Sequence, residues 1–151
     1  MAGHVGPILK IISLEPRQIE RILNRTNPSE QIPDTAKIIT ASLDNSIALW
    51  DYEKMSTIST LESPKTSELT CITFLYRCFL VASGHEDGAI RLWNMEINSS
   101  VLLKCHDQEK RHTNTISCIT STFWKDSEFL ICGSYDGKIS IWEISEKPAS
   151  G

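Results

Sequence analysis

Residue types that could act together in catalysis occur at two places in the chain. His4, Thr40 and Asp44 supply the imidazole, hydroxyl and carboxylate that a nucleophilic triad uses. His112 and Cys132 offer an imidazole and a thiol for related chemistry. Similar residue sets recur along the chain, however, whereas an active site is needed only once. The recurrence favours a structural role, and we predict no enzymatic activity and no catalytic residue.

A metal site is the second chemical possibility. Cys105, His106, His112 and Cys118 could be considered as zinc ligands, but their spacing fits no ordinary Cys/His zinc pattern. No glycine-rich phosphate loop and no calcium loop is present in the sequence. We therefore predict that the protein binds no metal and no cofactor.

The five cysteines are an odd number and include no Cys-x-x-Cys pair. Cys71 and Cys118 occupy the same place in LTCITF and ISCITS, which is typical of small buried residues. We predict reduced thiols and an intracellular, cytoplasmic location, with a cytoskeletal or ciliary one as the alternative.

The chain contains a pattern that occurs three times. Residues 38–51 read IITASLDNSIALWD, residues 79–94 read FLVASGHEDGAIRLWN and residues 129–143 read FLICGSYDGKISIWE. In each copy a tryptophan follows an aspartate by six residues, and successive tryptophans are 43 and 49 residues apart. A period of this size indicates a repeat architecture with one supersecondary unit per period.

Each repeat is expected to form a four-stranded antiparallel unit. A polar loop beginning at His4, Lys65 or His112 leads into a first apolar strand, and alternating β-branched residues favour strands over helices. Asn45, Gly88 and Gly137 follow the turn aspartates and suit a positive φ. Residues 55–61 and 101–105 read as fourth strands, and repeat three has no clear fourth strand.

The predicted domain is one segment of three repeats at 1–146 with a tail at 147–151. Repeat one spans about 2–61, repeat two about 63–105 and repeat three about 110–146. An insertion at 14–37 interrupts repeat one, and Pro16 with the helical spacing that follows predicts a short amphipathic helix over about 16–25. Two interpretations of the insertion stay open, a surface excursion and a docking element.

The composition excludes several classes of partner. The 151 residues are 40% apolar and carry a formal net charge of −4, which argues against nucleic acid as the main partner. No apolar run approaches the ~20 residues of a membrane-spanning helix, and residues 1–10 lack the pattern of a signal peptide. We therefore expect proteins as partners, and neither nucleic acid nor membrane.

These motifs resemble those of the WD-repeat family, whose fold is a β-propeller of four-stranded blades. The resemblance implies a buried tetrad of entry-loop histidine, second-strand hydroxyl, turn aspartate and tryptophan in each repeat. Lys65 stands where repeat two needs histidine and Cys132 where repeat three needs a hydroxyl, so looser networks are expected there. Gly84-His85 is interpreted as a decoy because it lies in the turn. The matching positions are His4, Thr40, Asp44 and Trp50 in repeat one, Ser83, Asp87 and Trp93 in repeat two, and His112, Asp136 and Trp142 in repeat three.

The resemblance also implies a partner-binding face made of entry loops and aspartate turns. In the family, the residues on either side of the first apolar position of strand one line this face, together with the residue before the turn aspartate. The corresponding positions are Pro7, Leu9 and Leu43 in repeat one, Glu68, Thr70 and Glu86 in repeat two, and Thr115, Ser117 and Tyr135 in repeat three.

The function predicted from these observations is a non-enzymatic platform for protein–protein interaction. The alternative is a structural component of a larger cytoskeletal or ciliary assembly. Three repeats do not close a ring if propellers have 4–8 blades. We therefore expect a fragment or a short isoform of a larger propeller, whose partners include the remaining blades or further copies of the same chain.

Overall fold

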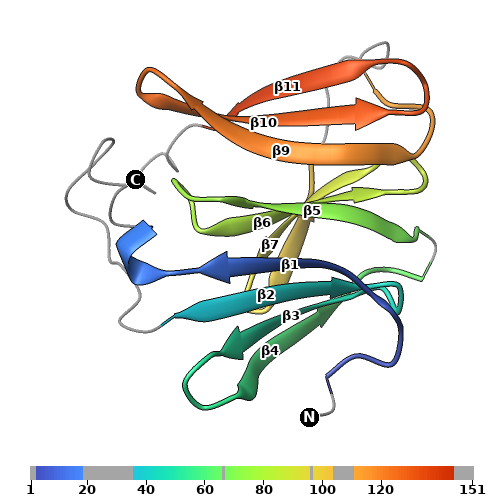
Figure 1. Ribbon diagram of the computed structural model, residues 1–151. Coiled ribbons are helices and arrows are strands. Elements are labelled where there is room, and N and C mark those ends of the chain that lie inside the picture. Colours follow the sequence, from blue (N-terminus) through green and yellow to red (C-terminus); the bar gives the residue numbers. More distant parts are fainter. Residues whose placement is uncertain (1–2, 19–35, 66, 96, 104–110, 145–151) are drawn as a thin grey trace.

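The computed structural model describes residues 3–18, 36–65, 67–95, 97–103 and 111–144. Apart from one helical turn, the regular elements of these residues are β-strands, arranged as three antiparallel sheets (Figure 1). This arrangement confirms the predicted all-β class and the incomplete propeller of three repeats. No helix in this part of the chain is long and apolar enough to cross a membrane.

Each sheet pairs its strands in chain order, and we call the three sheets blade one, blade two and blade three. Blade one contains β1 (Ile8–Leu14), β2 (Lys37–Ser42), β3 (Ser46–Asp51) and β4 (Ser56–Glu62). Blade two contains β5 (Leu69–Leu75), β6 (Leu80–His85), β7 (Ile90–Asn94) and β8 (Ser99–Leu102). Blade three contains β9 (Ile116–Trp124), β10 (Ser127–Ser134) and β11 (Ile139–Ile144).

A turn around an aspartate joins the second and third strands of every blade. The residues after these aspartates have positive φ angles, 66° at Asn45, 83° at Gly88 and 79° at Gly137, which confirms the turn prediction. At Gly88 a second reason excludes a side chain, because a Cβ atom would lie 2.6 Å from the carbonyl oxygen of His112. The glycine therefore lets the turn of blade two approach the entry loop of blade three.

Two apolar clusters join the blades. One packs residues of blade one, such as Ile39 and Ile47, against Val81 and Trp93 of blade two. The other packs residues of blade two, such as Ile90, against Ile116 and Leu130 of blade three. Successive side chains of a strand point to opposite faces of its sheet, so blade two can contribute to both clusters. It lies between the other two blades (Figure 1).

The insertion of repeat one connects the end of β1 to the start of β2, and these two strand ends are paired in the sheet. Leu14 at the end of β1 pairs with Lys37 at the start of β2. A helical turn begins at Pro16 and continues to Gln18. Proline favours the first turn of a helix, so the start lies where the sequence predicted it. The rest of the predicted helix and the loop after it lie outside the described residues.

Two side chains of blade three are exposed. Trp124, at the end of β9, is 67% exposed. Cys118 was expected to be buried like Cys71, but it is exposed whereas Cys71 is half-buried. Cys118 lies opposite Gly133 of β10 and Cys71 lies opposite Gly84 of β6, so the two thiols hold equivalent positions. Only Cys71 has a following blade against its face, and its thiol bonds to the carbonyl oxygen of Ile116.

Candidate functional site

The entry loop, second strand and third strand of blade one meet in a hydrogen-bonded network. Trp50 donates its indole N–H to Thr40 Oγ1 over 2.8 Å, and His4 Nε2 lies 2.6 Å from the same oxygen. His4 Nδ1 lies 2.7 Å from Ser46 Oγ, which donates to Asp44 Oδ1, and this nitrogen is 3.3 Å from Asp44 Oδ2. A neutral imidazole can accept at one nitrogen and donate at the other, so the four side chains are linked in a continuous network through Ser46.

Asp44 is the electrostatic centre of this network. Burial alone would raise its pKa, but hydrogen bonds from the Ser46 hydroxyl and from the backbone N–H groups of Val5 and Ser46 lower the pKa to about 2. The Val5 N–H lies 2.8 Å from Asp44 Oδ2. The carboxylate therefore stays ionised at neutral pH and holds the entry loop against the turn.

Blade two forms the equivalent network with a histidine from a different place. Trp93 donates to Ser83 Oγ over 2.6 Å, and His85 Nε2 lies 2.8 Å from that oxygen. His85 Nδ1 lies 3.3 Å from the backbone oxygen of Ser67, whose hydroxyl donates to Asp87 over 2.6 Å. Our interpretation of His85 as a decoy was wrong. It is fully buried and occupies the imidazole position that Lys65 cannot fill.

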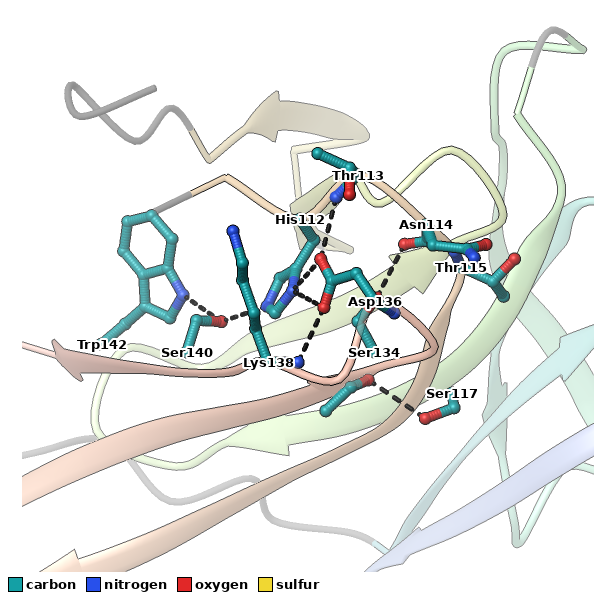
Figure 2. Close-up of polar contacts among 11 residues, drawn as sticks. His112, Thr113, Asn114, Thr115, Ser117, Ser134, Asp136, Lys138, Ser140 and Trp142 are labelled. Atoms are coloured by element: carbon teal, nitrogen blue, oxygen red, sulfur yellow. Dashed lines mark hydrogen bonds and ion pairs between the residues drawn. The ribbon is translucent and has the colours of Figure 1, made fainter. Parts of the chain in front are cut away.

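In blade three the hydroxyl comes from a different strand. Figure 2 shows Trp142 joined through Ser140 to His112 and on to Asp136. Trp142 donates to Ser140 Oγ over 3.2 Å, and His112 Nε2 lies 2.8 Å from it. His112 Nδ1 lies 3.1 Å from Asp136 Oδ2. Ser140 is the cross-strand partner of Cys132, so the hydroxyl has moved across one strand pair within the sheet.

The networks of blades two and three differ from that of blade one: His85 reaches Asp87 only through Ser67, and the Trp142–Ser140 bond is 3.2 Å long, against 2.8 Å for Trp50–Thr40. Each departure from the pattern is compensated by a residue that the alignment of repeats did not consider. Ser83 and His85 are two residues apart and therefore face the same side of β6. Ser140 lies opposite Cys132 on the neighbouring strand. A search for a histidine on the same strand face as Ser83, and for a hydroxyl on the strand opposite Cys132, would have found both.

Replacing Ser140 by alanine should lower the free energy of unfolding by about 1–2 kcal/mol, because His112 and Trp142 lose their shared partner. Urea denaturation at neutral pH would measure this. The matched test is the double variant Ser140→Ala with Cys132→Ser, which returns a hydroxyl to the position used in blades one and two. It should recover part of the loss. A double variant less stable than Ser140→Ala alone would contradict the relocation.

The nine predicted face residues form three groups of three, one in each blade. In each group a backbone hydrogen bond joins two of the three residues. The N–H of Leu43 donates to the oxygen of Pro7 over 2.9 Å. The same bond joins Glu86 to Glu68 at 2.9 Å and Tyr135 to Thr115 at 3.0 Å. Each bond ties an aspartate turn to its own entry loop. The three blades therefore present equivalent loop pairs, supported from beneath by the three networks.

The face residues differ in how far their side chains are available. Leu43 and Tyr135 are 51% and 72% exposed, and both glutamates are also exposed. Leu9 is half-buried and packs against the cluster between blades one and two. Thr70 donates to the backbone oxygen of Ile116 over 2.6 Å and so links blade two to blade three. The exposed surface is therefore apolar at its two ends and acidic in the middle.

The Thr40 hydroxyl and the Cys132 thiol, which we considered for catalysis, are not accessible as nucleophiles. His4, Thr40 and Asp44 do lie in contact, but the Thr40 hydroxyl is buried and already receives the Trp50 indole N–H. Burial raises the pKa of the Cys132 thiol to about 12, so a reactive thiolate is not available there. Among the described residues, Cys71, Cys78, Cys118 and Cys132 carry free thiols, and no group of three or more potential metal ligands is found. Cys105 and His106 of the considered zinc set lie outside that part.

Comparison with known proteins agrees with the blade architecture. A sequence model of the IP5P C-F beta-propeller family matches residues 36–150. The COMPASS component SWD3 of Saccharomyces cerevisiae is 23% identical over 139 residues, which cover 89% of this chain and 44% of that protein. The ribosome biogenesis protein WDR12 homolog of Trichoplax adhaerens is 31% identical over 116 residues, which cover 74% of this chain and 25% of that protein.

A solved structure shows the same fold. The crystal structure of RRP9 WD40 repeats superposes with a TM-score of 0.66 at 18% identity, over 95% of this chain and 37% of that one. The three-blade fold with its tryptophan networks and the family match together define the class. The chain belongs to the WD-repeat β-propeller family. It spans less than half the length of the curated relatives named here.

Proposed function

We propose that the chain is a non-enzymatic platform that binds protein partners through the face of entry loops and aspartate turns. The observation that supports this most directly is the repeated backbone bond between loop and turn, seen at Leu43, Glu86 and Tyr135. It fixes three exposed side chains on rigid supports. One relative is named as a component of COMPASS and another as a ribosome biogenesis protein, which agrees with a role alongside other proteins.

The partner that fits this face has apolar side chains on either side of a basic group. Leu43 and Tyr135 are exposed apolar anchors at the two ends, and exposed aromatic residues are common at binding hot spots. Glu68 and Glu86, joined by their backbone bond, place two carboxylates between them. A lysine or arginine of the partner would complement this acidic centre.

The proposal predicts that Tyr135→Ala and Leu43→Ala each weaken partner binding by roughly 1–2 kcal/mol without changing thermal stability. Partners captured by the wild-type chain would be identified by mass spectrometry, and their affinities for each variant measured with purified components. Ile97→Ala, an exposed change in the β7–β8 turn away from this face, is the control. If both variants bind normally while replacement of residues 15–36, between the paired strand ends, by a short linker abolishes binding, the insertion is the docking element instead.

We propose in addition that the protein is located in the cytoplasm and does not catalyse a reaction. The free thiols of the described cysteines favour a reducing, intracellular compartment. The lack of an accessible nucleophile at Thr40 and Cys132 supports a binding role. The second candidate is a structural component of a cytoskeletal or ciliary assembly. The exposed apolar side chains on the outer faces of blades one and three favour it, because a larger assembly would cover them.

A further inference from the structure

Two outer faces of the described blades carry exposed isoleucines at positions that are buried elsewhere in the molecule. Ile47, Ile90 and Ile139 each lie three residues after their turn aspartate. Ile47 is 0% exposed and Ile90 is 4% exposed, because the next blade covers each of them. Ile139 is 73% exposed and Ile141, two residues further along β11, is 65% exposed. We call this side of a blade its isoleucine face.

Blade one has exposed isoleucines on the other side of its sheet, at positions that are buried in blade two. Ile11 of β1 corresponds to Ile72 of β5 and is 61% exposed, whereas Ile72 is 3% exposed because it packs against blade one. Ile8 corresponds to Leu69 and is likewise exposed where Leu69 is buried. These residues share the side of the sheet that carries the repeat tryptophan. We call that side the tryptophan face.

Both contacts between blades join unlike faces. The tryptophan face of blade two, with Trp93 and Ile72, packs against the isoleucine face of blade one, with Ile47. The tryptophan face of blade three, with Trp142, packs against the isoleucine face of blade two, with Ile90. The molecule thus shows one mode of packing twice. Within the part of the chain that the structure describes, the tryptophan face of blade one and the isoleucine face of blade three have no blade against them.

We propose that the outer isoleucine face of blade three binds the outer tryptophan face of blade one in a second copy of this chain. Unlike faces that are both present on one chain make a head-to-tail contact, and such contacts form a closed ring if the rotation returns to its start. The described blades of two copies make six, within the usual range of about 4–8 for a closed propeller. Each copy would then bury both of its outer faces.

Trp124 and Cys118 provide a second observation on the same surface. Both lie on β9 on the side of Ile139 and Ile141, and both are exposed. The equivalent cysteine of blade two, Cys71, is covered by Ile116 of the next blade. A large aromatic ring on the same sheet face as two isoleucines fits the apolar composition of an interface core. The pattern on β9 therefore agrees with a face that receives another blade.

The test uses sedimentation of the purified full chain and three glutamate variants at similarly exposed isoleucines. Ile141→Glu changes the isoleucine face of blade three, Ile11→Glu changes the tryptophan face of blade one, and Ile97→Glu lies in the β7–β8 turn away from both. The wild type and Ile97→Glu should sediment as dimers. Each of the other two should raise the dimer dissociation constant by at least about tenfold, because the contact would bury an unpaired carboxylate.

Mixing the two weakened variants separates head-to-tail contact from other modes. The Ile11→Glu chain keeps its isoleucine face and the Ile141→Glu chain keeps its tryptophan face, so an equimolar mixture should form a heterodimer through one intact contact. A wild type that stays monomeric at all concentrations would overturn the proposal. So would an Ile11→Glu chain that dimerises normally, or a mixture that stays monomeric. Circular dichroism of each variant would confirm that it is folded before sedimentation. Ile139→Glu replaces Ile141→Glu, and Ile8→Glu replaces Ile11→Glu, if either is not folded.

Discussion

Replacing Trp93 by alanine is expected to lower the free energy of unfolding by about 3–5 kcal/mol. Trp93 is 1% exposed and packs with Val81, Phe74 and Met95 between blades one and two. The change removes the ring from this cluster and deprives Ser83 of the indole N–H that it accepts at 2.6 Å. Since whole domains are stable by only about 5–15 kcal/mol, the loss should be easily seen.

Urea denaturation followed by circular dichroism would measure the effect of this change. Tyr52→Ala is the control, because Tyr52 is an exposed aromatic residue in the β3–β4 turn. Trp93→Phe keeps most of the packing and loses only the hydrogen bond, so its loss should lie between those of the other two variants. An alanine variant as stable as the wild type would show that the network of blade two contributes little to folding.

The fold could be predicted from the sequence because of the repeat period. The six-residue spacing from aspartate to tryptophan and the alternating apolar runs are local features, and a turn with a positive φ requires residues such as Asn45 or Gly88. Strand order within a blade follows from short connections. These features require no knowledge of how one blade lies against the next.

What could not be predicted depends on contacts between strands and between blades. His85 and Ser140 take over network positions because His85 lies on the same face of β6 as Ser83 and Ser140 lies opposite Cys132, and the second of these becomes visible only once the register is known. Cys118 and Cys71 have equivalent sequence positions but different exposure, because only one of them has a following blade. Sequence equivalence therefore predicts the direction of a side chain but not what covers it.

Glu128 is a residue that sequence reasoning missed entirely. It is fully buried in β10 of blade three, and its two carboxylate oxygens accept the backbone N–H groups of Tyr76 at 2.9 Å and Arg77 at 2.8 Å. These donors belong to the β5–β6 turn of blade two. Burial raises the pKa of Glu128, and the bonds from the Arg77 and Tyr76 N–H groups act against this rise. The carboxylate thus joins two blades at a point where the sheets have no shared backbone bond.

Replacing Glu128 by alanine should lower the free energy of unfolding by about 2–4 kcal/mol, because two buried N–H groups lose their acceptors together. Glu128→Gln keeps one acceptor oxygen and should lose roughly half as much. Urea denaturation would give the energies, and hydrogen exchange at Tyr76 and Arg77 would report on the turn itself. Glu53→Ala, at an exposed glutamate of the β3–β4 turn, is the control. If exchange at these two amides were unchanged in Glu128→Ala, the link between blades two and three would have to lie elsewhere, since the carboxylate contacts the turn through these N–H groups.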